Sequence, residues 1–359
     1  MTISRKVGTR LRFGGNVQPL WDAGLDGSGQ SIAILAASNV NVSDVRNFRQ
    51  VFGLPANDPQ VVVNGRDPGV TNKPQAFEKE AVIDAEWAGA VAPGAAIRLI
   101  VSESTNSTSG SDLSAEYAVD NNVAPVLSGS YAFCESTLGP AGNQFHNRLW
   151  QQAAAQGMTV VIGTGDGGAA DRDAERGASP PAPARSGLTV NGVASTPYNV
   201  AVGGTDFQDL TSADMYWNAA NNPTTHASAK GYIPETTWND SCTNVLFAPS
   251  AGFVSDAETN CNNRSLVNFV STAGGGGGRS ALYSKPVWQA GLGVPADGAR
   301  DIPDVSLFSG SAQSGNIYLF CEADLQNGAP CGLDDSGYHA RNGITASFFL
   351  IRRRPNSIL

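Results

Sequence analysis

Charged residues are scarce in this chain of 359 residues, and most of them are acidic. Lysine and arginine together number 23, against 32 aspartates and glutamates, so the net charge is -9 and the pI is near 4.8. Because nucleic acid is bound mainly through basic surfaces, this balance argues against a nucleic-acid partner. The same composition suits an acidic medium, in which protonation of carboxylates brings the net charge towards zero.

Long apolar runs are also missing. No run approaches the roughly 18 residues of a membrane-spanning helix, so we expect no membrane partner. The first residues, 1–17, lack the apolar core of a signal peptide and therefore give no information about export.

Histidine is rare, with only His146, His226 and His339 in the whole chain. None of them stands in the His-Gly-Thr setting of a histidine-dependent serine protease or in the His-Glu-x-x-His motif of a zinc protease. We interpret each as an ordinary surface or core residue, and both of these protease classes lose support.

The five cysteines include two closely spaced pairs, Cys242 with Cys261 and Cys321 with Cys331. No Cys-x-x-Cys or Cys/His spacing indicates zinc. We therefore predict two disulfides, an oxidising compartment and one remaining free thiol at Cys134.

Short apolar runs that end in small residues alternate with helical stretches. The runs predict strands over 31–37, 95–102, 124–130, 158–165 and 199–205, and the helices are expected over 42–52, 77–91, 112–121 and 142–156. This alternation predicts an α/β fold, with a doubly wound parallel sheet and helices on both of its faces. Residues 205–298, which are rich in Asn, Ser, Thr and Gly, are interpreted as long surface loops.

The predicted helix 77–91 carries Glu80 and Asp84 within its apolar face. At 100° per residue the two acids lie about 40° apart, surrounded by apolar side chains, namely Phe77, Ile83, Trp87, Ala88 and Val91. Glu78 and Glu86 fall on the opposite side and are interpreted as solvated. A charge buried without a partner costs several kcal/mol, so we expect Glu80 and Asp84 to share a proton or to face a cleft.

Each of these features has a simpler structural interpretation. Glu80 and Asp84 could be solvated acids at the start of a helix, and Asp166, between glycines after a strand, could form an Asx turn. The glycine run 274–278 could be a linker. Because an aromatic stretch follows it directly, we interpret it instead as backbone that lines a groove for an extended peptide.

Seven segments, in order along most of the chain, resemble the sedolisin family of serine-carboxyl peptidases. One of them, 127–135, has Ala132 where the family usually has glycine. The segments are 20–35, 80–95, 127–135, 163–169, 193–207, 274–289 and 300–306. The resemblance implies a subtilisin-like fold and an acid-acting serine-type endopeptidase that hydrolyses protein or peptide substrates.

The resemblance also implies residue roles. Glu80 would be the general base, Asp84 the carboxyl that orients it and shares its proton, and Asp166 a protonated acid in the oxyanion hole. Substrate binding would fall on Ser130, Tyr131, Gly275 and Gly276. A carboxylate base stays usable in acid, where a histidine would be protonated.

The resemblance weakens at the nucleophile, where the family has Gly-Thr-Ser and this chain has Thr345-Ala346-Ser347. One alignment places Ala346 at the nucleophile position, and an alignment with one extra residue places Ser347 there, which we prefer. The arginines at 352–354 do not suit the buried apolar helix that follows the family's serine. The family's calcium-binding aspartates are not found further on, so we expect no metal and no cofactor in this chain.

The resemblance divides the chain into residues 1–17 as a residual propeptide or linker, 18–351 as an incomplete catalytic domain and 352–359 as a tail foreign to the family. This pattern predicts a truncated or frame-shifted secreted peptidase that is a monomer and has little or no activity as written. Two alternatives stay open. One is a catalytically inactive remnant that binds peptide in its glycine-lined groove, and the other is an unrelated doubly wound hydrolase or carbohydrate-binding protein.

Overall fold

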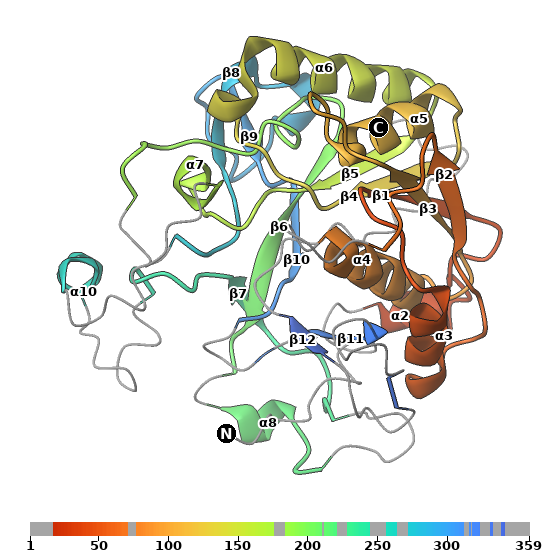
Figure 1. The fold of residues 1–359 in the computed structure, drawn as a ribbon. Helices are drawn as coiled ribbons and strands as arrows, with labels where there is room; N and C mark the ends of the chain where they lie inside the picture. Colours follow the sequence, from red (N-terminus) through yellow and green to blue (C-terminus); the bar gives the residue numbers. More distant parts are fainter. Residues whose placement is uncertain are drawn as a thin grey trace.

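One sheet of eight strands runs through the chain in the computed structural model (Figure 1). Seven of the strands are parallel and follow the order β10-β6-β5-β4-β1-β3-β2, and β7 (Glu235–Thr237) pairs antiparallel with β6. Their bounds are β1 Ser31–Ala36, β2 Gln60–Asn64, β3 Ala96–Ser102, β4 Val126–Gly129, β5 Thr159–Gly163, β6 Val200–Phe207 and β10 Val305–Phe308.

The structure describes residues 17–70, 77–175, 184–209, 212–220, 228–244, 256–263, 272–311, 316, 318–323, 331–332 and 339–341. The shorter elements in these ranges are α2 Gln18–Asp22, α7 Asp171–Glu175, α8 Ala213–Tyr216, α10 Ala257–Asn262 and the 3-10 helix Val287–Gln289. Two hairpin-like pairs stand apart from the main sheet, namely β8 (Gly278–Ser284) with β9 (Ala299–Ile302), and β11 (Tyr318–Phe320) with β12 (His339–Arg341).

Helices cover both faces of the sheet, which explains why its central strands are apolar throughout. In β1, every residue after Ser31 is buried. The helices α3 (Val42–Val51) and α4 (Phe77–Val91) lie on one side, whereas α5 (Gly110–Asp120) and α6 (Glu135–Ala155) lie on the other (Figure 1). The fold class predicted from the sequence is therefore confirmed.

The predicted helix over 142–156 is longer in the structure, because α6 begins at Glu135. Its first turns were missed because Gly139 has a non-helical backbone (φ 62°) and Pro140 follows it. Proline has no N–H to donate and is tolerated only near a helix start. The element is therefore one helical turn joined at a kink to a longer helix that ends at Ala155.

The interpretation of 205–298 as surface loops is wrong in part. Within this range, β7 extends the main sheet, and Trp217, Ile233 and Trp238 are each 3% exposed or less. These side chains are isolated among polar residues, so no periodic pattern marks them. The region therefore supplies part of the core as well as loops.

Both predicted disulfides are present, Cys242–Cys261 and Cys321–Cys331, and Cys134 is free and buried. The Sγ atom of Cys134 lies 3.3 Å from the hydroxyl of Ser136 and 3.0 Å from that of Thr137. A buried thiol packed at the start of a helix in this way has a structural role. The cysteine spacing alone thus predicted all three assignments.

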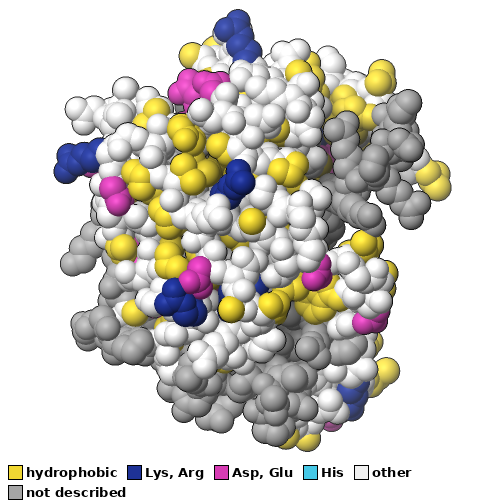
Figure 2. Space-filling view, turned by 90° about the vertical axis from the view of Figure 1, so that its right-hand side faces the viewer, with side chains coloured by type: hydrophobic (Ala, Val, Ile, Leu, Met, Phe, Trp, Pro, Cys, Tyr) yellow, Lys and Arg dark blue, Asp and Glu magenta, His cyan; other side chains and the backbone are white. Residues whose placement is uncertain are grey.

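Charged side chains are also sparse on one face of the molecule (Figure 2). On the face in Figure 2, basic and acidic side chains stand singly among polar and apolar ones, and no basic patch gathers there. Among the described helices, none is both long enough and apolar enough to cross a membrane.

Candidate functional site

Helix α4 brings Glu80 and Asp84 to the edge of the sheet where the parallel strands end. It connects β2 to the parallel strand β3 and therefore runs back across the sheet, so its first turns lie at the carboxyl edge. Glu80 is half-buried in the first turn, and Asp84, one turn later, is 1% exposed. Carboxylates near a helix N-terminus are favoured by the helix dipole.

Ser130 and Tyr131 directly follow β4, and Ser130 contacts Asp84. The Ser130 hydroxyl donates to Oδ1 of Asp84 at 2.9 Å. The Tyr131 hydroxyl accepts from the backbone N–H of Ala37 at 3.2 Å, and its ring meets Phe77 edge to face. The sequence-predicted residues Asp84, Ser130 and Tyr131 therefore lie together.

The hydroxyl of Tyr131 lies in the field of both acids. Burial raises the pKa of Tyr131 far above its ordinary value, the hydrogen bond from Ala37 lowers it, and the nearby charges of Glu80 and Asp84 raise it further. Tyr131 therefore stays protonated at any pH at which the acids titrate. The charges of Glu80 and Asp84 thus both act on this one hydroxyl.

Asp166 reaches the same edge from the neighbouring strand. β4 and β5 are adjacent and parallel, with Gly129 opposite Ile162, so the residues that follow them leave the sheet side by side. The Asp166 side chain is exposed, and its backbone carbonyl accepts from Gly274 at 2.9 Å. An exposed carboxyl at this edge is accessible to a ligand.

The glycine run packs directly on the end of β5. Gly276 donates its N–H to the carbonyl of Gly165 at 2.8 Å and accepts from the Thr164 hydroxyl at 2.7 Å. A Cβ atom on Gly276 would lie 2.0 Å from the Thr164 carbonyl oxygen, and one on Gly275 would lie 3.0 Å from the backbone of Gly204. Close approach of backbones thus requires glycine here, and a part in peptide binding stays a prediction.

The expectation that Glu78 and Glu86 are solvated is wrong. Both are 0% exposed, because α4 is covered on all sides by the sheet, by α3 and by the segment around β11. The Nε1 of Trp87 donates to the carbonyl of Leu319 at 2.8 Å, which fixes β11 against the helix. A third covering layer cannot be seen from the periodicity of a single helix.

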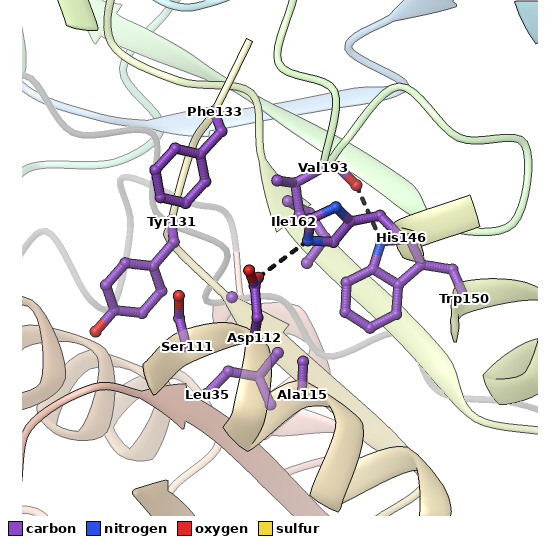
Figure 3. Close-up of a pocket in the computed structure, with 11 residues that line it drawn as sticks. Leu35, Ser111, Asp112, Ala115, Tyr131, Phe133, His146, Trp150, Ile162 and Val193 are labelled. Atoms are coloured by element: carbon purple, nitrogen blue, oxygen red, sulfur yellow. Dashed lines mark hydrogen bonds and ion pairs between the residues drawn. The ribbon is translucent and has the colours of Figure 1, made fainter. Parts of the chain in front are cut away.

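A small cavity lies beside Tyr131, lined by residues of the sheet and of the helices α5 and α6. Figure 3 shows Tyr131 and Phe133 projecting from one side of it, with His146 and Trp150 on the other. Its volume of about 20 Å³ is sufficient for a single water molecule. In this form the cavity is too small for a substrate side chain.

His146 at this cavity is 1% exposed and links α5 to α6. Its Nδ1 lies 3.0 Å from the carbonyl oxygen of Gly142, and its Nε2 lies 3.1 Å from Oδ1 of Asp112 (Figure 3). Because both ring nitrogens have partners, His146 is not placed to accept a proton from a serine. Its interpretation as a core residue is confirmed, whereas the side chains of His226 and His339 are outside the described residues.

Ser347 and Ala346 also lie outside the described residues, so the nucleophile position stays a prediction. Within the described ranges, one group of residues has the spacing of metal ligands, namely Asp44 with Cys321 and Cys331. The two cysteines form a disulfide and have no thiolate to offer, so this group does not fit a calcium ion, which takes oxygen ligands.

We predict that Ser130→Ala destabilises the protein by about 2 kcal/mol, because the buried Asp84 would lose a hydrogen bond. Urea denaturation at pH 6 measures this loss. Ser107→Ala, at an exposed serine, is the control and should change stability by less than about 0.5 kcal/mol. Equal effects of the two substitutions would mean that the Ser130–Asp84 bond contributes nothing.

Two curated proteins are similar to this chain in sequence. The chain is 29% identical over 294 residues to kumamolisin of Bacillus sp. (strain MN-32), a match that covers 79% of this chain and 43% of the relative. It is 28% identical over 297 residues to sedolisin of Pseudomonas sp. (strain 101), covering 81% of this chain and 42% of the relative. These similarities support the sedolisin family for this chain.

A solved structure shares the fold of this chain. It is Pseudomonas sedolisin, a serine-carboxyl proteinase complexed with two molecules of pseudo-iodotyrostatin, with a TM-score of 0.66 and 24% identity over 97% of this chain and 78% of that one. No family model matches the chain. The chain spans less than half the length of the curated relatives, so the activity of the whole protein is a matter for proposal.

Proposed function

We propose that this chain is the catalytic domain of an acid-acting serine-carboxyl endopeptidase. In this proposal Glu80 is the general base, Asp84 orients it and shares its proton, and Asp166 stabilises the oxyanion. Ser347 is the nucleophile, and Ser130, Tyr131, Gly275 and Gly276 bind the substrate backbone.

The observation that carries the proposal is the buried carboxyl of Asp84, held by Ser130 at the strand edge that also carries Asp166. Burying a carboxyl to 1% exposure costs free energy unless the carboxyl is hydrogen-bonded. Such a buried acid at a strand edge is typical of a functional site. Similarity to kumamolisin and to sedolisin, the latter a serine-carboxyl proteinase, supports the same conclusion.

The chemistry follows from the environments of the acids. A carboxylate with an ordinary pKa near 4.3 can accept the proton of a serine hydroxyl under acidic conditions. Because Asp84 lies next to Glu80, the two carboxyls titrate as a pair. The pair therefore keeps one shared proton while Glu80 takes up the proton of the serine hydroxyl. A protonated Asp166 would donate a hydrogen bond to the oxyanion, whereas an ionised one would repel it.

Secretion and a monomeric state belong to the same proposal. The two disulfides support an oxidising compartment. A calcium ion, which the family resemblance implies, would need ligands from outside the described residues. The residue roles given above require no metal ligand from the described residues.

A second candidate function is a peptide-binding remnant without catalysis. It rests on the alignment that places Ala346 at the nucleophile position, since alanine has no hydroxyl to attack a carbonyl. In that case the acids would persist without a nucleophile.

The test is cleavage of an unstructured protein, followed by mass spectrometry from pH 3 to 7. The purified chain is compared with its Ser347→Ala and Ala346→Ser variants. Cleavage that is lost in Ser347→Ala supports the nucleophile at Ser347, and cleavage gained in Ala346→Ser supports the inactive remnant. If no form cleaves but the chain binds the substrate, the second candidate is favoured over the first.

A further inference from the structure

A buried carboxyl that the residue roles above do not use lies at the start of α6. Glu135 is the first residue of this helix and is 6% exposed. Both of its oxygens accept hydrogen bonds from β8, which lies 145 residues further along the chain. The Ser280 hydroxyl donates to Oε1, and the N–H of Ala281 donates to Oε2 at 2.9 Å. Glu135 therefore fixes two distant segments relative to each other.

Strand β8 is irregular at the point where Glu135 contacts it. Arg279 pairs with Asp301 of β9, and the ladder resumes only at Ser284, with more residues of β8 than of β9 between the two pairs. We call residues 280–283 the β8 bulge. A bulge takes backbone groups out of the ladder, so the N–H groups of 280–283 need other acceptors.

Glu135 and Ser280 supply the acceptors for the β8 bulge. Ala281 donates to Glu135, whereas Leu282 and Tyr283 donate their N–H groups to the Ser280 hydroxyl at 3.1 and 3.0 Å. At 2% exposure, Ser280 is the one buried residue of β8, so apolar packing contributes little to holding this strand. Because Glu135 accepts the proton of the same hydroxyl, the shape of the bulge depends on Glu135.

The side chain of Tyr283 ties the bulge to α6 a second time. Burial and, after it, the charge of Glu135 raise the pKa of Tyr283 to about 12. The Tyr283 hydroxyl therefore stays protonated, and it donates to the carbonyl of Asn143 at 3.0 Å. The side chain of Asn143 donates in turn to the carbonyl of Glu135 at 2.8 Å. Figure 1 accordingly shows β8 beside α6.

The bridge from Glu135 to β8 joins two segments that the proposed function assigns to the substrate. One is segment 130–135, and the other is the glycine run 274–278, which β8 continues. Gly165 lies between them. Its carbonyl accepts from Gly276 at 2.8 Å, and a Cβ atom on Gly165 would lie 3.4 Å from that of Ala132. The bridge therefore closes these three neighbours into a ring.

We propose that Glu135 is a positioning residue of the peptide-binding site, which shapes the β8 bulge and thereby sets the spacing between segment 130–135 and the glycine run. This role rests on the proposed function, in which both segments bind the substrate backbone. Without the carboxyl, Ser280 and Ala281 lose their acceptor and the bulge relaxes. An extended peptide then no longer meets both segments at once, and displacements of this kind are costly even when they arise away from the reacting atoms.

Hydrogen exchange of the full chain at pH 5 tests the structural part of this proposal. In Glu135→Ala, peptides that cover 276–283 should lose at least tenfold in protection, and those of β1 less than threefold. Glu135→Gln keeps one acceptor oxygen and should give an intermediate loss. Val45→Ala, buried in α3 on the other side of the sheet, is the matched control for general destabilisation. It should lower the protection of β1 at least as much as that of 276–283.

Substrate affinity tests the functional part, with casein as an unstructured probe. In the form that cleaves, Glu135→Ala should raise KM at least tenfold and change kcat less than threefold, and Glu135→Gln should restore part of the loss. If no form cleaves, the Kd for fluorescently labelled casein should rise by the same factor. A merely structural role would lower only the folded fraction, as in Val45→Ala, and leave KM or Kd unchanged.

Unchanged protection of 276–283 in Glu135→Ala overturns the proposal, as does a local loss of protection with unchanged KM or Kd. In both cases a parent chain that cleaves or binds casein leaves the proposed function intact. A parent chain that neither cleaves nor binds casein contradicts the proposed function itself, and the role of Glu135 falls with it.

Discussion

Replacing Glu80 with glutamine is expected to lower the turnover number by a factor of about a hundred or more, a typical contribution of a general base. Glutamine has the size of glutamate and can still hydrogen-bond, but it cannot take a proton from a serine hydroxyl. Substrate binding should change much less, because the backbone of Ser130 and Tyr131 is unaffected. The loss should therefore fall on kcat and leave KM nearly constant.

This measurement uses the form that cleaves, whether the chain as written or its Ala346→Ser variant, and records kcat and KM at the acidic optimum. Glu116→Gln removes one acid from the exposed face of α5 and controls for the change in net charge. Near-full turnover of Glu80→Gln would show that another group is the base. Equal losses in both variants would indicate a general effect of charge.

Replacing Gly276 with alanine is expected to destabilise the protein by about 3 kcal/mol, at the upper end for overpacking of a closely packed site. The new Cβ would lie 2.0 Å from the Thr164 carbonyl oxygen and 2.9 Å from that of Gly165, and both are backbone atoms that cannot turn aside. To relieve the clash, the glycine run would have to leave the end of β5. The loop that carries Asp166 would then lose its support.

The midpoint of urea denaturation measures this effect. Gly291→Ala is the matched control, because a Cβ there meets open space within 4 Å, and its stability should stay within about 0.5 kcal/mol of the parent. If Gly276→Ala unfolds at the same urea concentration as the control, the glycine run is a tolerant linker after all.

Much of the fold could be predicted from local patterns, because its main elements carry clear signals. The strands β1, β3, β4, β5 and β6 are apolar runs that end in small residues, since each is buried between helices and ends at a loop. Cysteine spacing likewise predicted both disulfides. The edge strand β2 was missed because none of its residues is fully buried, which gives a weak pattern.

Only the part of the candidate site that lies on one helix could be predicted from the sequence pattern. Glu80 and Asp84 stood out because acids on an apolar face conflict with ordinary burial. The same reasoning failed for Glu86, since its face is covered by β11, more than 230 residues further along the chain. The bond from Ser130 to Asp84 has no local signal either, because it depends on how β4 and α4 pack.

The two disulfides also determine what a single break in the backbone would do. Cys242 is tied to Cys261 across 19 residues, and Cys321 to Cys331 across 10. A cut inside either span leaves both fragments covalently joined, so the downstream part cannot diffuse away. On a denaturing gel such a nicked molecule would run as one band without reductant and as two bands with it. Without reductant, its intact mass would exceed that of a continuous chain only by the one water molecule added on hydrolysis.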